Sequence, residues 1–168
     1  MNAEFATATH ALVYLLHVGR CVTSDELADN ICTNPARVRK IMAKLCKAGL
    51  VSSGAGRASG YSDAEDHDLA RITLRDVIEA LGESPVSPSW HPGDVDRPCL
   101  VSSGMGEVID DVYDRLNERC LEELASISIG QVLHTLEERE AGLTTGPTEA
   151  DRHDVGLAHA WQADTSGA

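Results

Sequence analysis

Residues 24–51 read SDELADNICTNPARVRKIMAKLCKAGLV and contain the signals of two helices separated by a short turn. Thr23 precedes them, and a glutamate three residues later completes the capping-box pattern that starts a helix. Asn34 and Pro35 then fit the cap and first position of a second helix, because Asn accepts backbone N–H bonds there and proline has no N–H to leave unpaired. We expect this helix over residues 35–48, ending at a glycine. The arrangement is typical of a helix-turn-helix.

The second helix has two chemically different faces, one apolar and one basic. Its apolar residues recur at helical spacing and should pack on the protein body: Val38, Ile41, Met42 and Leu45. Its basic residues recur at intervals of three, four and three and should form one solvent-facing stripe: Arg37, Lys40, Lys44 and Lys47. The helix is therefore expected to pack through one side and to present cations on another.

A glycine-rich segment follows the second helix. Residues 50–52 are expected to form a short strand, residues 54–60 a turn that contains Arg57, and Tyr61 the start of a returning strand. Residues 62–66, SDAED, have a poor composition for a strand. A two-stranded ribbon directly after the helix-turn-helix would be a wing.

The rest of the chain predicts mainly α-helical structure. An amphipathic helix is expected over residues 4–18, and Thr73 caps another that runs to residues 81–82. Residues rich in Pro, Ser and Gly then indicate a loop up to residue 103. The expected remainder consists of a long acidic helix, a short helix and an aperiodic tail, over residues 104–125, 128–139 and 140–168.

The charge distribution favours a local cationic surface on an acidic protein. The net charge is −13, but residues 1–80 carry nine Lys or Arg against ten Asp or Glu, whereas the remainder carries five against seventeen. The segment 35–57 has six basic residues and no acidic one: Arg37, Arg39, Lys40, Lys44, Lys47 and Arg57. Such a patch favours nucleic-acid binding, because the position of the charges matters more than their total. The alternative is an ordinary solvated helix face.

Several classes of protein are disfavoured by what the sequence lacks. No stretch approaches the ~20 apolar residues of a membrane span, and the N-terminus has no basic region typical of a secretory signal, so we expect a cytoplasmic protein. The five cysteines form no Cys-x-x-Cys pair, which indicates free thiols. We find no phosphate-binding loop, nucleophile motif or zinc motif, and therefore predict no enzyme.

The chain resembles the IscR/NsrR-type, or Rrf-two, family of winged helix-turn-helix transcriptional regulators over roughly residues 5–136. The resemblance depends on motifs in the family's order, SDELADNI at 24–31, NPARVRKIMAKL at 34–45, KAGLV at 47–51 and ITLRDV at 72–77, with a glycine-rich wing between them and an acidic helix after them. It implies a homodimer that binds double-stranded DNA, with the recognition helix in the major groove and the wing at the minor groove. Repression is the usual mode of such regulators.

The residue pattern and the resemblance together predict an organisation and an interface. The expected parts are a winged helix-turn-helix DNA-binding domain (1–82), a loop with a candidate sensor cysteine (83–103), dimerisation helices (104–139) and a disordered acidic tail (140–168). The long helix is expected to carry the dimer interface through a stripe of apolar residues: Met105, Ile109, Val112 and Leu116.

The candidate DNA contacts lie on the turn, the recognition helix and the wing: Thr33, Asn34, Arg37, Arg39, Lys40, Lys44, Lys47, Arg57 and Tyr61. Arg37 and Arg39, near the helix start, are the candidates for reading guanine edges. Thr33 and Asn34 could bind a phosphate, and the lysines with Arg57 could neutralise others. The competing hypothesis is a winged-helix module that binds another protein and no DNA.

The loop before the long helix departs from the cluster-binding members of the family. Those members carry three closely spaced cysteines there, whereas this chain has only Cys99. Three interpretations stay open: an unreactive thiol, a redox-sensing thiol favoured as thiolate by Arg97, or an iron–sulfur cluster. A cluster needs four ligands, and only Cys99, Cys120 and His10, drawn from across the dimer, can be named. Without a cluster, His10 is interpreted as a core or interface histidine.

Overall fold

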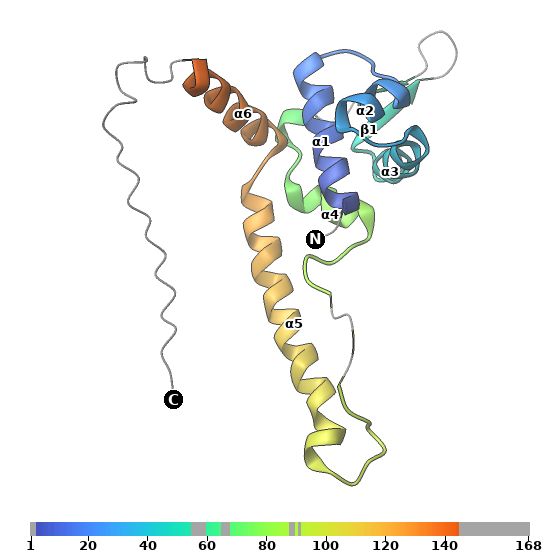
Figure 1. Cartoon of the computed structure of the whole chain (residues 1–168), viewed down its shortest axis with the longest axis vertical. Helices are drawn as coiled ribbons and strands as arrows, with labels where there is room; N and C mark the ends of the chain where they lie inside the picture. The colour runs from blue at the N-terminus through green and yellow to red at the C-terminus, as the bar shows by residue number, and fades with distance from the viewer. Residues whose placement is uncertain (1–2, 55–59, 65–67, 88–89, 91, 145–168) are drawn as a thin grey trace, which may run out of the picture. The chain divides into compact units, whose positions relative to one another are not determined.

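The computed structural model describes residues 3–54, 60–64, 68–87, 90 and 92–144. The described part is mainly α-helical with one two-stranded sheet, as predicted (Figure 1). In chain order the elements are α1 (Ala3–Val18), α2 (Ser24–Ile31), α3 (Pro35–Lys47), β1 (Val51–Gly54), β2 (Gly60–Asp63), the 3-10 helix η2 (Leu69–Arg71), α4 (Leu74–Leu81), α5 (Leu100–Ser126) and α6 (Ile129–Thr144). The chain divides into two compact units, Met1–Thr135 and Leu136–Ala168, and only the end of α6 is described in the second.

The caps predicted for the helix-turn-helix are present. The Thr23 side chain accepts a hydrogen bond from the backbone N–H of Glu26 at 3.2 Å, and Asn34 Oδ1 accepts one from Arg37 N at 2.8 Å. Pro35 occupies the first turn of α3, where it removes no hydrogen bond. The Glu26 carboxylate, which the capping box would direct to the backbone, instead accepts hydrogen bonds from Arg20 and Tyr14.

The core lies among the first four helices and η2. All four residues of the predicted apolar stripe of α3 are buried, together with residues of α1 such as Leu12 and Leu15 and residues of α4 such as Val77. Burying four such side chains stabilises α3 by several kcal/mol, at about 1.5–3 kcal/mol each, before the cost of ordering them is counted. α3 is therefore held firmly with its opposite side outward.

The returning strand of the wing forms despite its poor composition. β2 pairs antiparallel with β1, with Ser53 opposite Tyr61. The other edge of Tyr61 also pairs, because its backbone exchanges hydrogen bonds of 2.8 and 2.9 Å with Val22. Gly60 permits this approach, since an added Cβ would lie 2.7 Å from the Val22 carbonyl oxygen. Backbone pairing on both edges thus outweighs the weak strand propensity of residues 62–63.

α4 has the expected cap, whereas α5 and α6 are longer than expected. Thr73 and Asp76 form a reciprocal capping box, and Gly82 ends α4 with a φ of +69°. α5 begins at Leu100, four residues before the predicted start, because the serines and glycines that suggested a loop continue the helix. α6 extends to Thr144, so the predicted tail begins in helix, and residues 145–168 lie outside the described part.

Candidate nucleic-acid interface

The solvent side of α3 is cationic around two small residues. Opposite the buried stripe, the exposed residues of the helix are Ala36, Arg37, Arg39, Lys40, Ala43 and Lys47. At 100° per residue the two alanines lie near the centre of this side together with Lys40 and Lys47. Arg39 and Arg37 lie on its opposite flanks. Small central side chains let another molecule approach the helix closely while the flanking cations reach around it.

The predicted basic stripe is divided, because two of its lysines bind Glu4 at the start of α1. Lys40 Nζ lies 3.1 Å from Glu4 Oε1, and Lys44 Nζ lies 2.7 Å from Glu4 Oε2. Lys44 also donates a hydrogen bond of 3.2 Å to the Leu81 carbonyl at the end of α4. The Lys44 side chain is only 32% exposed, whereas that of Lys40 is 69% exposed. The prediction that Lys44 faces solvent is therefore wrong: it joins α3 to α1 and α4.

The surroundings of the Glu4 carboxylate stabilise its negative charge. Hydrogen bonds from Lys44 and then Lys40 lower the pKa of Glu4 below its ordinary value of 4.5, against a smaller opposing effect of burial. The carboxylate also lies in the first turn of α1, where the helix dipole favours a negative charge. The contacts of Glu4 could not be predicted from the sequence, because Glu4 lies 36 and 40 residues from its two partners.

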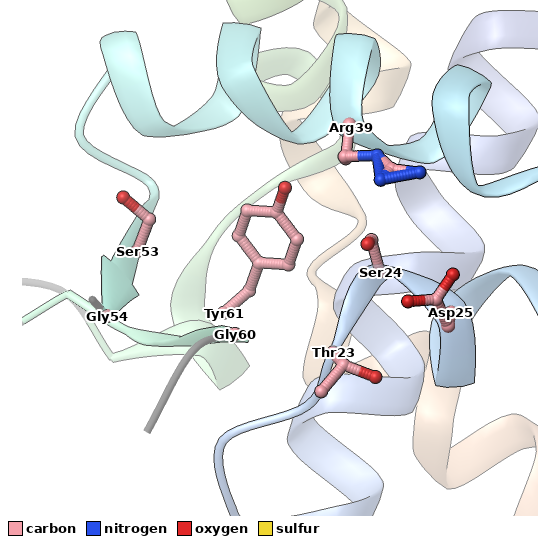
Figure 2. Close-up of a pocket in the computed structure, with 8 residues that line it drawn as sticks. All are labelled: Thr23, Ser24, Asp25, Arg39, Ser53, Gly54, Gly60 and Tyr61. Atoms are coloured by element: carbon pink, nitrogen blue, oxygen red, sulfur yellow. The ribbon is translucent and has the colours of Figure 1, made fainter. Parts of the chain in front are cut away.

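A polar cavity of about 340 Å³ lies where α3, the start of α2 and the wing meet. Figure 2 shows that its lining comes from three elements, with Arg39 from α3, Ser24 and Asp25 from α2, and Ser53 and Tyr61 from the wing. Burial raises the pKa of the Tyr61 phenol, so its hydroxyl stays protonated as a hydrogen-bond donor. The structure thus brings two predicted contact residues, Arg39 and Tyr61, to one place. Ser24, Asp25 and Ser53 were not predicted, since nothing local marks them.

The other predicted contacts of the turn and the wing have different environments. Asn34 is exposed, but its side-chain oxygen already caps α3. Thr33 is half-buried and its backbone N–H donates to the Ala28 carbonyl at 2.9 Å. Arg57 lies outside the described residues.

Cys99 occupies the N-cap position of α5 and is exposed. The backbone N–H groups of Ser102 and Val101 lower the pKa of its thiol, because N–H dipoles near the start of a helix favour the thiolate. Arg97, the predicted source of this effect, instead lies 3.7 Å from Asp94, with which it forms an ion pair. The thiolate is therefore favoured by the helix start and not by the neighbouring arginine.

The three residues proposed as cluster ligands do not gather in one protomer. His10 is exposed and pairs with Asn30 Oδ1 at 2.9 Å, so it is no core histidine. Cys120 is half-buried on α5, twenty-one positions after Cys99. Among the residues that the structure describes, no group of three His, Cys, Asp or Glu side chains could hold a metal ion. The described donors of a single chain therefore do not fit an iron–sulfur cluster.

The apolar stripe predicted on α5 is only partly buried by the rest of the described chain. Leu124 is the only buried residue of α5, all 27 residues of which are described. In the stripe, Met105 is 39% and Leu116 46% exposed, while Ile109 and Val112 are half-buried. Two further exposed residues at the same helical spacing, Val101 and Val108, extend the stripe beyond the prediction. None of the described helices is long and apolar enough to cross a membrane.

Comparisons with known proteins agree on the class of protein that this chain resembles. The model of the Rrf2 family, described as iron-dependent transcriptional regulators, matches residues 1–146. A Bacillus subtilis protein named as an HTH-type transcriptional regulator, YwnA, is 29% identical over 136 residues, which are 81% of this chain and 98% of that protein. As predicted from the missing catalytic motifs, the family and this relative are regulators and not enzymes.

Two solved structures show the same fold. A transcriptional regulator from Lactobacillus plantarum superposes with a TM-score of 0.69 at 23% identity, covering 91% of this chain and all of the other. The structure titled T. potens IscR superposes with a TM-score of 0.59 at 19% identity, covering 91% of this chain and 96% of the other. At these identities the likeness establishes the winged-helix fold alone.

Proposed function

Because this chain belongs to the Rrf2 family of transcriptional regulators, we propose that it is a homodimeric repressor that binds specific sequences of double-stranded DNA through α3 and the wing. The observation that carries the proposal is the arrangement of α3, whose apolar side is buried while exposed cations surround two alanines on the opposite side. An α-helix of this kind fits the major groove, where an arginine such as Arg37 can bind a guanine edge.

The polar cavity beside α3 supports the same docking. If α3 enters the major groove and the wing reaches the adjacent minor groove, one DNA strand must cross the surface between them. That surface contains Arg39 and the Tyr61 hydroxyl, which can both donate hydrogen bonds to phosphate oxygens. Asp25 lines the same cavity and opposes an anion there, so the crossing strand should lie toward Arg39.

The dimer part of the proposal depends on the uncovered stripe of α5. Contiguous exposed apolar residues at helical spacing are typical of a surface that another helix covers. A second copy offers an identical stripe, and a two-fold dimer would present two α3 helices to two half-sites related by the same symmetry. We therefore expect an inverted-repeat operator.

The test is a fluorescence-anisotropy titration with a random-sequence duplex at several salt concentrations. Replacing Arg39 and Lys47 by alanine should weaken binding about tenfold or more at moderate salt. The slope of log K against log salt should become shallower by about 1.8 for each bound protomer, at about 0.9 for each lost phosphate contact. Alanine at Arg71 and Arg75, exposed residues of η2 and α4, removes the same charge elsewhere and should change neither quantity. A wild-type protein without salt-dependent DNA binding would favour the protein-interaction module instead.

Cys99 gives this regulator a place to sense oxidants. In the proposed step the thiolate sulfur forms a bond to one oxygen of a hydroperoxide and the O–O bond breaks. The other oxygen leaves as hydroxide or alkoxide and takes up a proton, so that sulfur loses two electrons to the peroxide and becomes a sulfenic acid. The exposed position and the thiol pKa lowered by two N–H groups favour this step. Oxidation one residue before α5 would disturb the dimer helix and thereby the spacing of the two recognition helices.

A further inference from the structure

We propose that Glu4 acts as an internal substitute for a DNA phosphate, which binds Lys40 of the recognition helix and so weakens binding to non-specific DNA. The inference deepens the proposed function and rests on it. The contact that carries it is the pair of ion bridges from one carboxylate to Lys40 and Lys44, at 3.1 and 2.7 Å. A carboxylate between two ammonium groups of a DNA-facing helix holds the position that a phosphate oxygen would otherwise take.

The two lysines differ in how freely they can exchange partners. Lys44 is held by Glu4 and by the Leu81 carbonyl, and most of its side chain is covered. Lys40 contacts Glu4 at the longer distance, 3.1 Å, and 69% of its side chain is exposed. A phosphate can therefore draw Lys40 away while Lys44 keeps Glu4 in place. Lys40 is the exchangeable cation, and Glu4 is the positioning residue that restrains it.

The effect should differ between random and specific DNA. On a random duplex the protein docks loosely, so no phosphate is positioned well enough to replace a carboxylate that is already bound. On a specific site the closer docking can place a phosphate at Lys40, and the exchange then costs little. Glu4 also brings a negative charge near the DNA backbone, which opposes loose binding through simple repulsion.

The test uses the full chain with Glu4→Gln, which keeps the shape and one acceptor oxygen but removes the charge. Binding to a random duplex at low salt should strengthen about fivefold, and the slope of log K against log salt should steepen by up to about 0.9 for each bound protomer, the value for one additional phosphate contact. Glu118→Gln is the matched control, because it removes the same charge from an exposed position of α5 and should leave the slope unchanged. A slope and affinity equal to those of the control would overturn the inference.

A double-mutant cycle tests whether Glu4 acts through Lys40. Lys40→Ala should weaken random-duplex binding less than twofold in the wild-type background, where Glu4 holds the lysine, and about fivefold in the Glu4→Gln background. Equal losses in the two backgrounds would refute the coupling. Thermal unfolding of each variant shows whether all are folded. If the wild type itself shows no salt-dependent binding, the proposed function fails, whereas a binding wild type with no Glu4 effect refutes this inference alone.

Discussion

α3 and α5 are both amphipathic, but their apolar sides have different fates. α3 buries all four residues of its stripe inside the protomer, whereas α5 is twice as long and buries only Leu124 among its described residues. The first helix is complete within one chain and leaves a cationic side for a charged ligand. The second is incomplete within one chain and leaves an apolar side for another protein surface. The same periodicity thus leaves a charged surface in one region and an apolar surface in the other.

The largest expected effect tests whether the apolar stripe of α3 is buried within one chain while that of α5 is covered only in a dimer. Leu45→Ala removes a fully buried side chain from α3 and should lower the free energy of unfolding by about 2–5 kcal/mol at any protein concentration. For Leu116→Ala on α5, the loss in free energy of unfolding should instead depend on protein concentration, because the leucine would be covered only in a dimer. Urea denaturation at two protein concentrations measures both. Equal concentration dependence of the two variants would contradict the distinction.

The next effect concerns assembly directly. Val112→Glu with Leu116→Glu should dissociate the dimer, because buried unpaired carboxylates are strongly unfavourable. Operator affinity should then fall about 100-fold, through loss of the second recognition helix. Sedimentation equilibrium and anisotropy report the two results. Alanine at Asp111 and Asp114, on the other side of α5, should preserve the dimer, and a dimer that survives the two glutamates would rule out this stripe as the interface.

A smaller effect should separate two lysines of α3. Lys44→Met should lower the free energy of unfolding by about 1 kcal/mol, because it breaks a hydrogen bond to Leu81 and an ion pair to Glu4. Lys47→Met, at an exposed position, should leave stability unchanged and make the salt slope of DNA binding shallower by about 0.9 for each bound protomer. Thermal unfolding and salt titrations distinguish the roles. If Lys47→Met destabilised the protein as much, the division of the basic stripe would be wrong.

The pH dependence of stability should reveal the Glu4 contact. Because the folded state lowers the pKa of Glu4 below 4.5, its contribution is present above that pH and is lost as the pH falls through the lowered value. The contribution should be less than about 1 kcal/mol, since the contact is partly exposed. Wild type should therefore be more stable than Glu4→Gln at pH 7, and the difference should shrink toward pH 3. A difference that is constant with pH would contradict the assignment.

The smallest effect on the reduced protein is expected at Cys99. Cys99→Ser should change DNA affinity less than twofold under reducing conditions, since the side chain is exposed and distant in sequence from α3. After mild peroxide treatment the wild type should lose affinity while the serine variant should not. Persistence of the peroxide effect in the variant would assign sensing to another cysteine.

The local structure followed from the sequence where the signals lie within a few residues of one another. The caps at Thr23, Asn34 and Thr73 and the apolar stripe of α3 are interactions over three or four positions, and all were predicted. The α5 start was placed late because its first residues, Ser102 to Gly104, have weak helix propensity, and apolar spacing alone marked the helix.

What the amino-acid sequence determined by itself is a winged helix-turn-helix with a recognition helix of two unlike faces. Only the tertiary structure decided that Glu4 takes two of the cations, that Val22 completes the returning strand and that Arg39 shares a cavity with Tyr61. The physical reason is the separation in sequence between the residues that interact. Helix caps and stripes depend on neighbours in the chain, whereas ion pairs and strand edges depend on which distant segments the packed core brings together.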